Sequence, residues 1–395
     1  MPNTLLTPSI ISKESLMILE NNLVMANRVN RKFENQFVKI GASLTVRKPN
    51  RFTVTSGPGL AIQNIAEPST SITVSNQKHV DFSFSATELS LTVEEFSERY
   101  LKTGMAELAN TIDFDVMSNF NQVYNLVGTP GTTPTTFATS VQLVGQRMDE
   151  EAVPQDMRTL VLNPASYWAI ANGLTSLFVE SVAEAALKGF LAKIGNFSVY
   201  MDQNVQNQTV GALGGSGVTA SAGQTGSSLV TNGWTASVTN LLRLGDVITV
   251  AGVNAVNPKS RQSTGVLRNF VVTAAVNSDS SGGATIPIFP AITTTGAYQT
   301  VNVSPASGAA IVIKTGTAGA VNPNNLAFVR DAFGLVMVPM EIPGGVDFSA
   351  RETYKDLSIR IIRAYDINND VLPCRMDVLY GTATYYPELA VRLTS

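Results

Sequence analysis

The chain has 395 residues, of which 44% are hydrophobic and 14% are charged, and its formal net charge at pH 7 is −3. This length suits a host domain with one insertion of domain size, and the low charge leaves no basic footprint for specific nucleic-acid binding. A single cysteine excludes an intrachain disulfide framework. The sequence shows no signal peptide and no apolar run of membrane-spanning length. We therefore expect a soluble chain that is made in a reducing cytoplasm and not exported.

The first expected helix covers residues 13–33, with Ser12 as its N-cap. Its apolar positions recur at helical spacing, at Leu16, Leu19, Leu23 and Ala26. Its last turns carry three cations, Arg28, Arg31 and Lys32, which complement the helix dipole. We interpret the segment either as a surface helix packed along one stripe or as an arm that packs on a neighbouring molecule.

A long β region is expected over residues 43–87. Apolar and polar residues alternate first at Leu44, Val46, Phe52 and Val54. The run Ser56-Gly57-Pro58-Gly59 breaks the pattern, which resumes after Pro68 at Ile72, Val74, Val80, Phe82 and Phe84. A lone long hairpin is marginally stable in water. We therefore expect a partner surface to cover it, supplied by another copy of the chain.

The longest expected helix starts after Thr92 and runs to Asn125. Thr92 and Glu95 have the spacing of a capping box, in which each side chain bonds the other residue's N–H group. The apolar positions that follow are spaced mostly four apart, and Gly128-Thr129-Pro130-Gly131 marks the break after the helix.

An α/β pattern occupies residues 136–201 and resumes after residue 321. The expected elements are a helix over 141–150, a buried strand over 159–162, helices over 165–172 and 179–191, a strand over 195–201, strand-like runs within 325–337, and strands over 357–365 and 378–386. The host is thus one α/β unit whose halves are separated by an insertion.

Between Met201 and Val321 the composition shifts to Gly, Ser, Thr, Ala, Asn and Val, with few charges. Residues 211–228 are almost all small, so we predict a flexible loop there and a folded part that begins near Trp234. Strands are expected over 244–253, 270–276, 285–289, 298–303 and 310–314. Short strands at near-regular spacing favour a small barrel or sandwich.

The residues offer no catalytic or metal-binding pattern. We interpret the single histidine, His79, as a surface or interface side chain and the single cysteine, Cys374, as a small buried hydrophobe. The carboxylate pairs Glu94/Glu95 and Glu150/Glu151 fit a helix cap and a solvated helix face. The glycine clusters match neither a Walker loop nor a dinucleotide fingerprint. We expect no enzyme activity, no cofactor and no metal.

Three stretches carry a family resemblance: Leu244-Gly245-Asp246-Val247-Ile248-Thr249-Val250-Ala251-Gly252-Val253; Asn325-Leu326-Ala327-Phe328-Val329-Arg330-Asp331-Ala332 with Val338-Pro339-Met340-Glu341-Ile342-Pro343; and Cys374-Arg375-Met376-Asp377-Val378-Leu379-Tyr380-Gly381 with Pro387-Glu388. In their order, and together with the order of elements, they resemble the coat proteins of tailed bacteriophages. The most similar subfamily is the P-22 type, which has an inserted domain. The small-residue stretch 211–228 departs from the pattern of that family.

The resemblance implies an α+β, HK-97 type major capsid fold with an inserted antiparallel β-barrel domain. It implies an N-terminal arm over 1–36, an extended loop over 37–90, a spine helix and peripheral domain over 91–134, an axial domain over 135–203 with its return at 321–350, the inserted barrel over 204–320, and peripheral C-terminal strands over 351–395.

The implied function is that of a non-enzymatic shell subunit of the virion, assembled in the host bacterial cytoplasm as a procapsid and then a mature head. The implied partners are the chain itself in pentamers and hexamers, a scaffolding protein, a portal, and packaged double-stranded DNA bound weakly and without sequence preference, with no membrane. The residues that we expect at contacts between subunits are Lys259, Arg261, Arg28, Arg31, Lys32, Arg47, Lys48 and Arg51. The basic loop 257–261 fits either a bridge between capsomers or a plain solvated loop.

Three alternatives stay open at this point. An encapsulin-like cellular shell protein would share the fold. A secreted β-rich adhesin fits the composition of the insertion but not the long helix or the lack of a signal peptide. An enzyme built on the α/β host would need a base and a nucleophile in one cleft.

Overall fold

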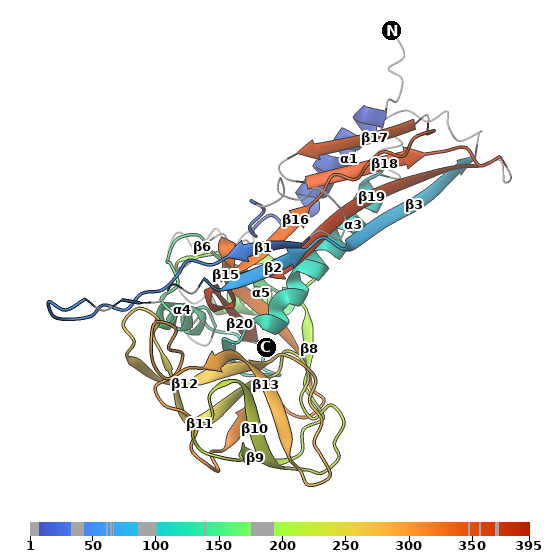
Figure 1. The fold of residues 1–395 in the computed structure, drawn as a ribbon. Coiled ribbons are helices and arrows are strands. Elements are labelled where there is room, and N and C mark those ends of the chain that lie inside the picture. Colours follow the sequence, from blue (N-terminus) through green and yellow to red (C-terminus); the bar gives the residue numbers. More distant parts are fainter. Residues whose placement is uncertain are drawn as a thin grey trace. The chain divides into compact units, whose positions relative to one another are not determined.

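The computed structural model, drawn in Figure 1, describes residues 8–32, 43–60, 62–63, 65, 67–85, 101–137, 140–174, 193–346, 348–354, 357–367 and 371–395. The chain divides into two compact units. Unit 1 consists of Met1–Val46, Ser69–Val116 and Phe333–Tyr385, and unit 2 of Arg47–Pro68, Met117–Ala332 and Tyr386–Ser395. Helices and strands are mixed in an α+β arrangement, as the family resemblance implied.

Unit 1 is built on a five-stranded antiparallel sheet. Its order is β16 (Phe333–Met337), β19 (Val371–Thr384), β18 (Leu357–Arg363) and β17 (Phe348–Tyr354), with β3 (Asn76–Ser85) paired along the other edge of β19. Helix α1 (Pro8–Asn22) packs on β17 and β18, and α3 (Lys102–Met117) is the longest helix of the described residues. A separate two-stranded sheet pairs β1 (Ser43–Arg47) with β2 (Ser69–Thr73).

The predicted helix over residues 13–33 was wrong at both ends. Helix α1 begins at Pro8, so Ser12 lies buried inside it instead of capping it. The helix ends at Asn22, and the side chain of Asp113 holds the backbone of the turn that follows. Its two carboxylate oxygens accept the N–H groups of Val24 at 2.6 Å and Ala26 at 2.7 Å. The basic cluster therefore lies in this turn and not in a last helical turn.

The β region is shorter than predicted. Strand β1 ends at Arg47, and Phe52 and Val54 lie in irregular, exposed chain, where no strand of the described residues pairs with them. The alternation from Ile72 onward is confirmed by β2 and β3. Thr92 and Glu95 lie outside the described residues. The predicted helix end at Asn125 was late, since α3 ends at Met117 and a 3-10 turn, η4 (Ser118–Gln122), follows.

Unit 2 contains a seven-stranded mixed sheet. Its order is β4 (Leu126–Gly128), β20 (Ala390–Thr394), β15 (Val321–Val329), β5 (Arg158–Leu162), β7 (Phe197–Met201) and β6 (Lys193–Ile194), with β8 (Asn207–Thr209) also paired to β15. Helix α4 (Val141–Glu150) shares a buried apolar core with strands of this sheet, and α5 (Pro164–Leu174) joins the same core. Helix α4 and strand β5 confirm their predictions, while the helix expected over 179–191 lies outside the described residues.

The insertion forms a nearly closed antiparallel barrel around its own apolar core (Figure 1). Its order is β14 (Ile311–Ile313), β11 (Val247–Val256), β12 (Ser263–Val272), β13 (Ala284–Ile292), β10 (Gly226–Trp234) and β9 (Gly215–Thr219). A bridge between Val218 in β9 and Ala310 beside β14 links the two ends of this order. The predicted barrel is thereby confirmed.

The prediction of a flexible loop over residues 211–228 was wrong, because this stretch contributes β9 and the start of β10. Its small residues answer a packing demand. A Cβ atom on Gly217 would lie 2.0 Å from the Trp234 indole, so only glycine fits under that ring. Two strand predictions also fail: β12 runs from Ser263 to Val272 in place of 270–276, and the segment 298–303 holds only an isolated bridge from Val301 to Ala255.

The chain enters and leaves the barrel side by side. In the pairing of β8 with β15, Asn207 lies opposite Pro323 and Thr209 opposite Val321. The last residues, Tyr386–Ser395, belong to unit 2 and supply β20, so the predicted C-terminal region 351–395 is shared between the two units. Among the helices of the described residues, none has the length and apolarity to span a bilayer.

Candidate assembly surfaces

A buried charge cluster fixes the barrel to the end of helix α4 in unit 2. Arg268 on β12 and Glu151, just after α4, are 2.6 Å apart, and each side chain is 3% exposed. Arg147 of α4 approaches the same carboxylate at 3.5 Å, and the Tyr124 hydroxyl donates to its other oxygen at 3.4 Å. Burial, the largest single influence, lowers the pKa of Arg268, but the interactions with Glu151 and Tyr124 together outweigh it and raise the pKa overall. Arg268 is therefore held in its charged form.

Apolar and aromatic contacts surround this cluster. The Arg268 guanidinium lies 4.6 Å from the centre of the Tyr124 ring, a cation–π distance. The same ring is tilted against Phe289 of β13 at 5.8 Å. Tyr124, Leu126, Val247 and Val271 form one buried apolar cluster that combines host and barrel residues. Buried apolar and aromatic contacts thus hold the barrel against the host part of unit 2.

Asp246 ties together the strands at the base of the barrel. Its carboxylate accepts the N–H groups of Gly211 at 3.0 Å and Arg243 at 2.8 Å. It also accepts the Gln208 amide at 3.1 Å and the Thr315 hydroxyl at 3.2 Å. Burial raises the pKa of Asp246, and these hydrogen bonds oppose the rise. One side chain thereby joins the entering chain to the leaving chain.

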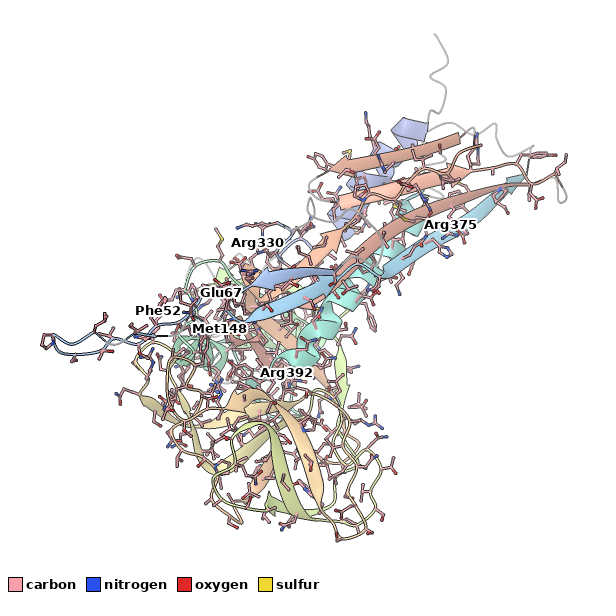
Figure 2. All side chains as sticks on the ribbon, viewed as in Figure 1. Phe52, Glu67, Met148, Arg330, Arg375 and Arg392 are labelled. Atoms are coloured by element: carbon pink, nitrogen blue, oxygen red, sulfur yellow. The ribbon has the colours of Figure 1, made fainter. Side chains whose placement is uncertain are left out.

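Arg392, a residue of the host sheet, contacts the base of the barrel. The residue is on β20, is fully buried and donates from Nη2 to the Gly245 carbonyl at 2.9 Å (labelled in Figure 2). Its guanidinium is 5.7 Å from the Phe120 ring. Burial lowers the pKa of Arg392 to about 9, and the negative charge of Asp246 partly offsets this effect. Arg392 and Asp246 are thus an electrostatically linked pair at the barrel base.

The predicted contact residues of the extended loop are anchored on unit 2. Arg47 forms an exposed ion pair with Glu67 at 3.3 Å. Arg51 pairs with Glu388 at 3.2 Å. Lys48 places its Nζ 5.0 Å from the centre of the Tyr386 ring, and burial lowers the pKa of Lys48. Arg47 therefore joins the two ends of the loop segment 47–68, while Lys48 and Arg51 hold its first end against Tyr386 and Glu388.

The segment between these ends exposes apolar side chains. Gln63 accepts the Thr53 N–H at 2.8 Å and donates back to the Thr53 carbonyl, so the two legs are joined there. The exposed fractions of the apolar side chains around this joint are large: Phe52 60%, Val54 96%, Leu60 90%, Ile62 84% and Ile65 71%. These five residues, hereafter the apolar loop, are left exposed by the part of the chain that the structure describes.

The other predicted contact residues lie apart from one another. Arg261 donates from Nη2 to the Phe52 carbonyl at 2.7 Å, so it contacts the apolar loop within the same unit. Lys259 is exposed in the same turn. In unit 1, Arg31 is buried and donates from Nε to the Ala26 carbonyl at 3.0 Å and to the Asn27 side chain. Arg28 is half-buried and Lys32 exposed.

Sequence reasoning missed the residues of the buried cluster. Glu151 was interpreted with Glu150 as a solvated face, which is wrong for Glu151 because it is buried against two arginines. Asp246 lies in the stretch 244–253 that carries the family resemblance, and its place beside Gly245 was the only sequence signal for its role. Cys374 is buried as predicted, and burial raises the pKa of its thiol to about 12. Within the described residues, no cluster of His, Cys, Asp or Glu is suited to hold a metal ion.

Comparison with known proteins gives the family. Residues 3–394 match the family described as P22 coat protein, gene protein 5. A search of curated proteins found no match. Among solved structures, a chain of Mycobacterium phage Che8 is 12% identical, with 94% of this chain and 90% of that chain covered and a TM-score of 0.49.

Two further structures are similar in part or in whole. The capsid of Ralstonia phage GP4 is 8% identical over 93% of this chain and 86% of that chain, with a TM-score of 0.47. The CUS-3 coat protein I-domain is 24% identical over 27% of this chain and 100% of that chain, with a TM-score of 0.20. The family match favours a phage coat protein over an encapsulin-like shell. The chain belongs to the P22 coat protein family and is a major capsid protein of tailed bacteriophages, which forms an icosahedral shell.

Proposed function

We propose that the chain, with an HK-97 type fold, assembles with copies of itself into pentamers and hexamers by covering the apolar loop of each subunit with a neighbouring subunit. The observation that carries the proposal is the exposure of five large apolar side chains on a loop whose legs are joined by Gln63. Water disfavours such a surface, and its burial contributes roughly 25 cal/mol per Å² of apolar area. Many modest contacts of this kind suit a shell made of identical subunits.

The proposal includes assembly in the host bacterial cytoplasm, with a scaffolding protein and a portal as partners and double-stranded DNA as cargo. The net charge of −3 supports weak, sequence-independent contact with DNA, since few counterions would be released on binding. This role requires no catalytic group and no cofactor.

Electron microscopy and light scattering of the purified full chain test the proposal, with and without a co-expressed scaffolding protein. We expect shells, tubes or capsomer-sized oligomers. A strictly monomeric species at high concentration under both conditions would refute it. The double variant Leu60→Asp/Ile62→Asp should lower the yield of assembled particles, while Arg243→Ala, an exposed change on the barrel, should leave the yield unchanged.

A further inference from the structure

The inserted barrel contacts the base of the apolar loop through a tyrosine. The Tyr298 hydroxyl donates to the Asn50 side-chain oxygen at 2.9 Å and accepts the Arg51 N–H at 3.3 Å. The Arg51 guanidinium lies 5.8 Å from the centre of the same ring while it pairs with Glu388. One barrel side chain therefore fixes the backbone and the side chains of two successive loop residues.

A second barrel residue holds the next position of the loop. Arg261 donates to the Phe52 carbonyl at 2.7 Å, and a charged donor makes this a strong hydrogen bond (Phe52 is labelled in Figure 2). Together, Tyr298 and Arg261 hold residues 50–52, directly before the joint between Thr53 and Gln63. The base of the loop is thus ordered over consecutive residues by the barrel.

The turn that carries Arg261 is held in place by its own hydrogen bonds. Arg261 has a φ of 55°, a backbone conformation that is uncommon for a residue with a side chain. Asn257 holds the turn, because its Oδ1 accepts the N–H groups of Lys259 at 2.9 Å and Ser260 at 3.0 Å. Its Nδ2 donates to the Glu150 carbonyl at the end of α4, at 2.8 Å. A continuous set of hydrogen bonds therefore runs from α4 through the barrel turn to the loop.

We propose that the inserted barrel is a positioning device for the apolar loop: Tyr298 and Arg261 fix the loop's direction so that its apolar side chains meet a second copy of the chain. The proposal rests on the proposed assembly function. It adds that the barrel is the part of the chain that orients the apolar loop for this contact. A loop that samples many directions presents the binding-competent one for only a fraction of the time, and the apparent affinity falls by that fraction. The barrel raises this fraction before any neighbour binds.

The test uses the full chain and the double variant Tyr298→Phe/Arg261→Ala, which removes one hydroxyl and one guanidinium. Arg243→Ala is the matched control, since it removes an exposed arginine side chain beside Asp246 at the base of the barrel. Before assembly, hydrogen exchange and limited proteolysis over residues 48–65 should become several-fold faster in the double variant only. The thermal unfolding of the full chain, followed by tryptophan fluorescence, should not shift.

In assembly, the double variant should need a several-fold higher concentration than the parent to reach the same particle yield, with particles of normal shape once formed. Unchanged exchange over 48–65 would show that the two residues do not hold the loop. Faster exchange with an unchanged concentration dependence would show that the loop's direction does not matter for assembly, and either result overturns the proposal. If the parent chain itself forms no particles, the proposed function fails first, and the exchange measurement still decides whether the barrel orders the loop.

Discussion

Arg268 and Glu151 form a 2.6 Å ion pair that joins the inserted barrel to the end of helix α4 in the host, with almost no exposure to water. Removal of one partner from a buried pair leaves an uncompensated charge, which costs about 3–5 kcal/mol. The pair thus makes the seat of the barrel highly sensitive to single substitutions.

We therefore expect Arg268→Met to lower the free energy of unfolding of the full chain by about 3 kcal/mol, because Glu151 then keeps only Arg147 and the Tyr124 hydroxyl. Urea unfolding followed by tryptophan fluorescence measures the change. Arg47→Met is the control, since its exposed pair with Glu67 is worth about 1 kcal/mol or less. Equal effects of the two substitutions would contradict the assignment of the seat.

The stability of unit 1 depends on pH through the carboxylate of Asp377. Burial alone raises its pKa, but hydrogen bonds from Arg360 at 2.7 Å and Arg375 at 2.6 Å outweigh this and lower the pKa overall. A carboxylate with a lowered folded-state pKa contributes stability that is present above its unfolded pKa of about 4 and is lost as the pH falls through the folded value.

We expect Asp377→Asn to destabilise the chain by about 2–3 kcal/mol at pH 7, because two arginines lose their carboxylate. The difference between parent and variant should shrink as the pH is lowered from about 4. Chemical unfolding of both proteins at a series of pH values tests this. A difference that stays constant down to acid pH would show that Asp377 does not titrate with unfolding.

Gly217 leaves room for the indole of Trp234. We expect Gly217→Ala to destabilise the barrel by about 3 kcal/mol, the upper end for overpacking, because the new Cβ would lie 2.0 Å from the ring. Gly223→Asn is the control: Gly223 has a φ of +75° with nothing within 4 Å, and asparagine tolerates that conformation. Thermal unfolding followed by tryptophan fluorescence would separate them, and a tolerated Gly217→Ala would show that the contact relaxes.

Arg31 has a structural task inside the turn that follows α1. We expect Arg31→Gln to destabilise unit 1 by about 1–2 kcal/mol, since its buried bond to the Ala26 carbonyl is lost. The pair of changes Arg28→Gln and Lys32→Gln should have a smaller effect on stability. Replacement of all three should alter assembly more than DNA retention. Normal shells that selectively lose packaged DNA would assign the cluster to phosphate contact instead.

The barrel should fold without its host. A fragment covering about residues 205–317 contains all six strands of the barrel sheet and a common apolar core. We expect a β-type circular dichroism spectrum and a cooperative melt. A random-coil spectrum would show that the barrel depends on its seat against Glu151 and Tyr124.

Periodicity and turn signals predicted the elements whose partners are close in sequence. Helix α4 matched its predicted bounds, since Val141, Val144 and Met148 form one buried stripe. The composition of residues 211–228 gave a wrong prediction of a flexible loop, because composition does not show that Trp234 lies over Gly217. The charge cluster was beyond prediction for the same reason: Glu151 and Arg268 are far apart in sequence, and only the fold shows that they neutralise each other.

The pairing of β8 with β15 places the two ends of the insertion next to each other. Because Thr209 and Val321 are partners across the two strands, the host sheet meets the whole barrel as if it were the loop of a β-hairpin. The entropy cost of closing a loop grows slowly with its length, by about 0.6 kcal/mol for each doubling. The length of the insertion therefore adds only a small entropy cost to the pairing of β8 with β15, while the buried ion pair of Arg268 with Glu151 holds this particular barrel to the host.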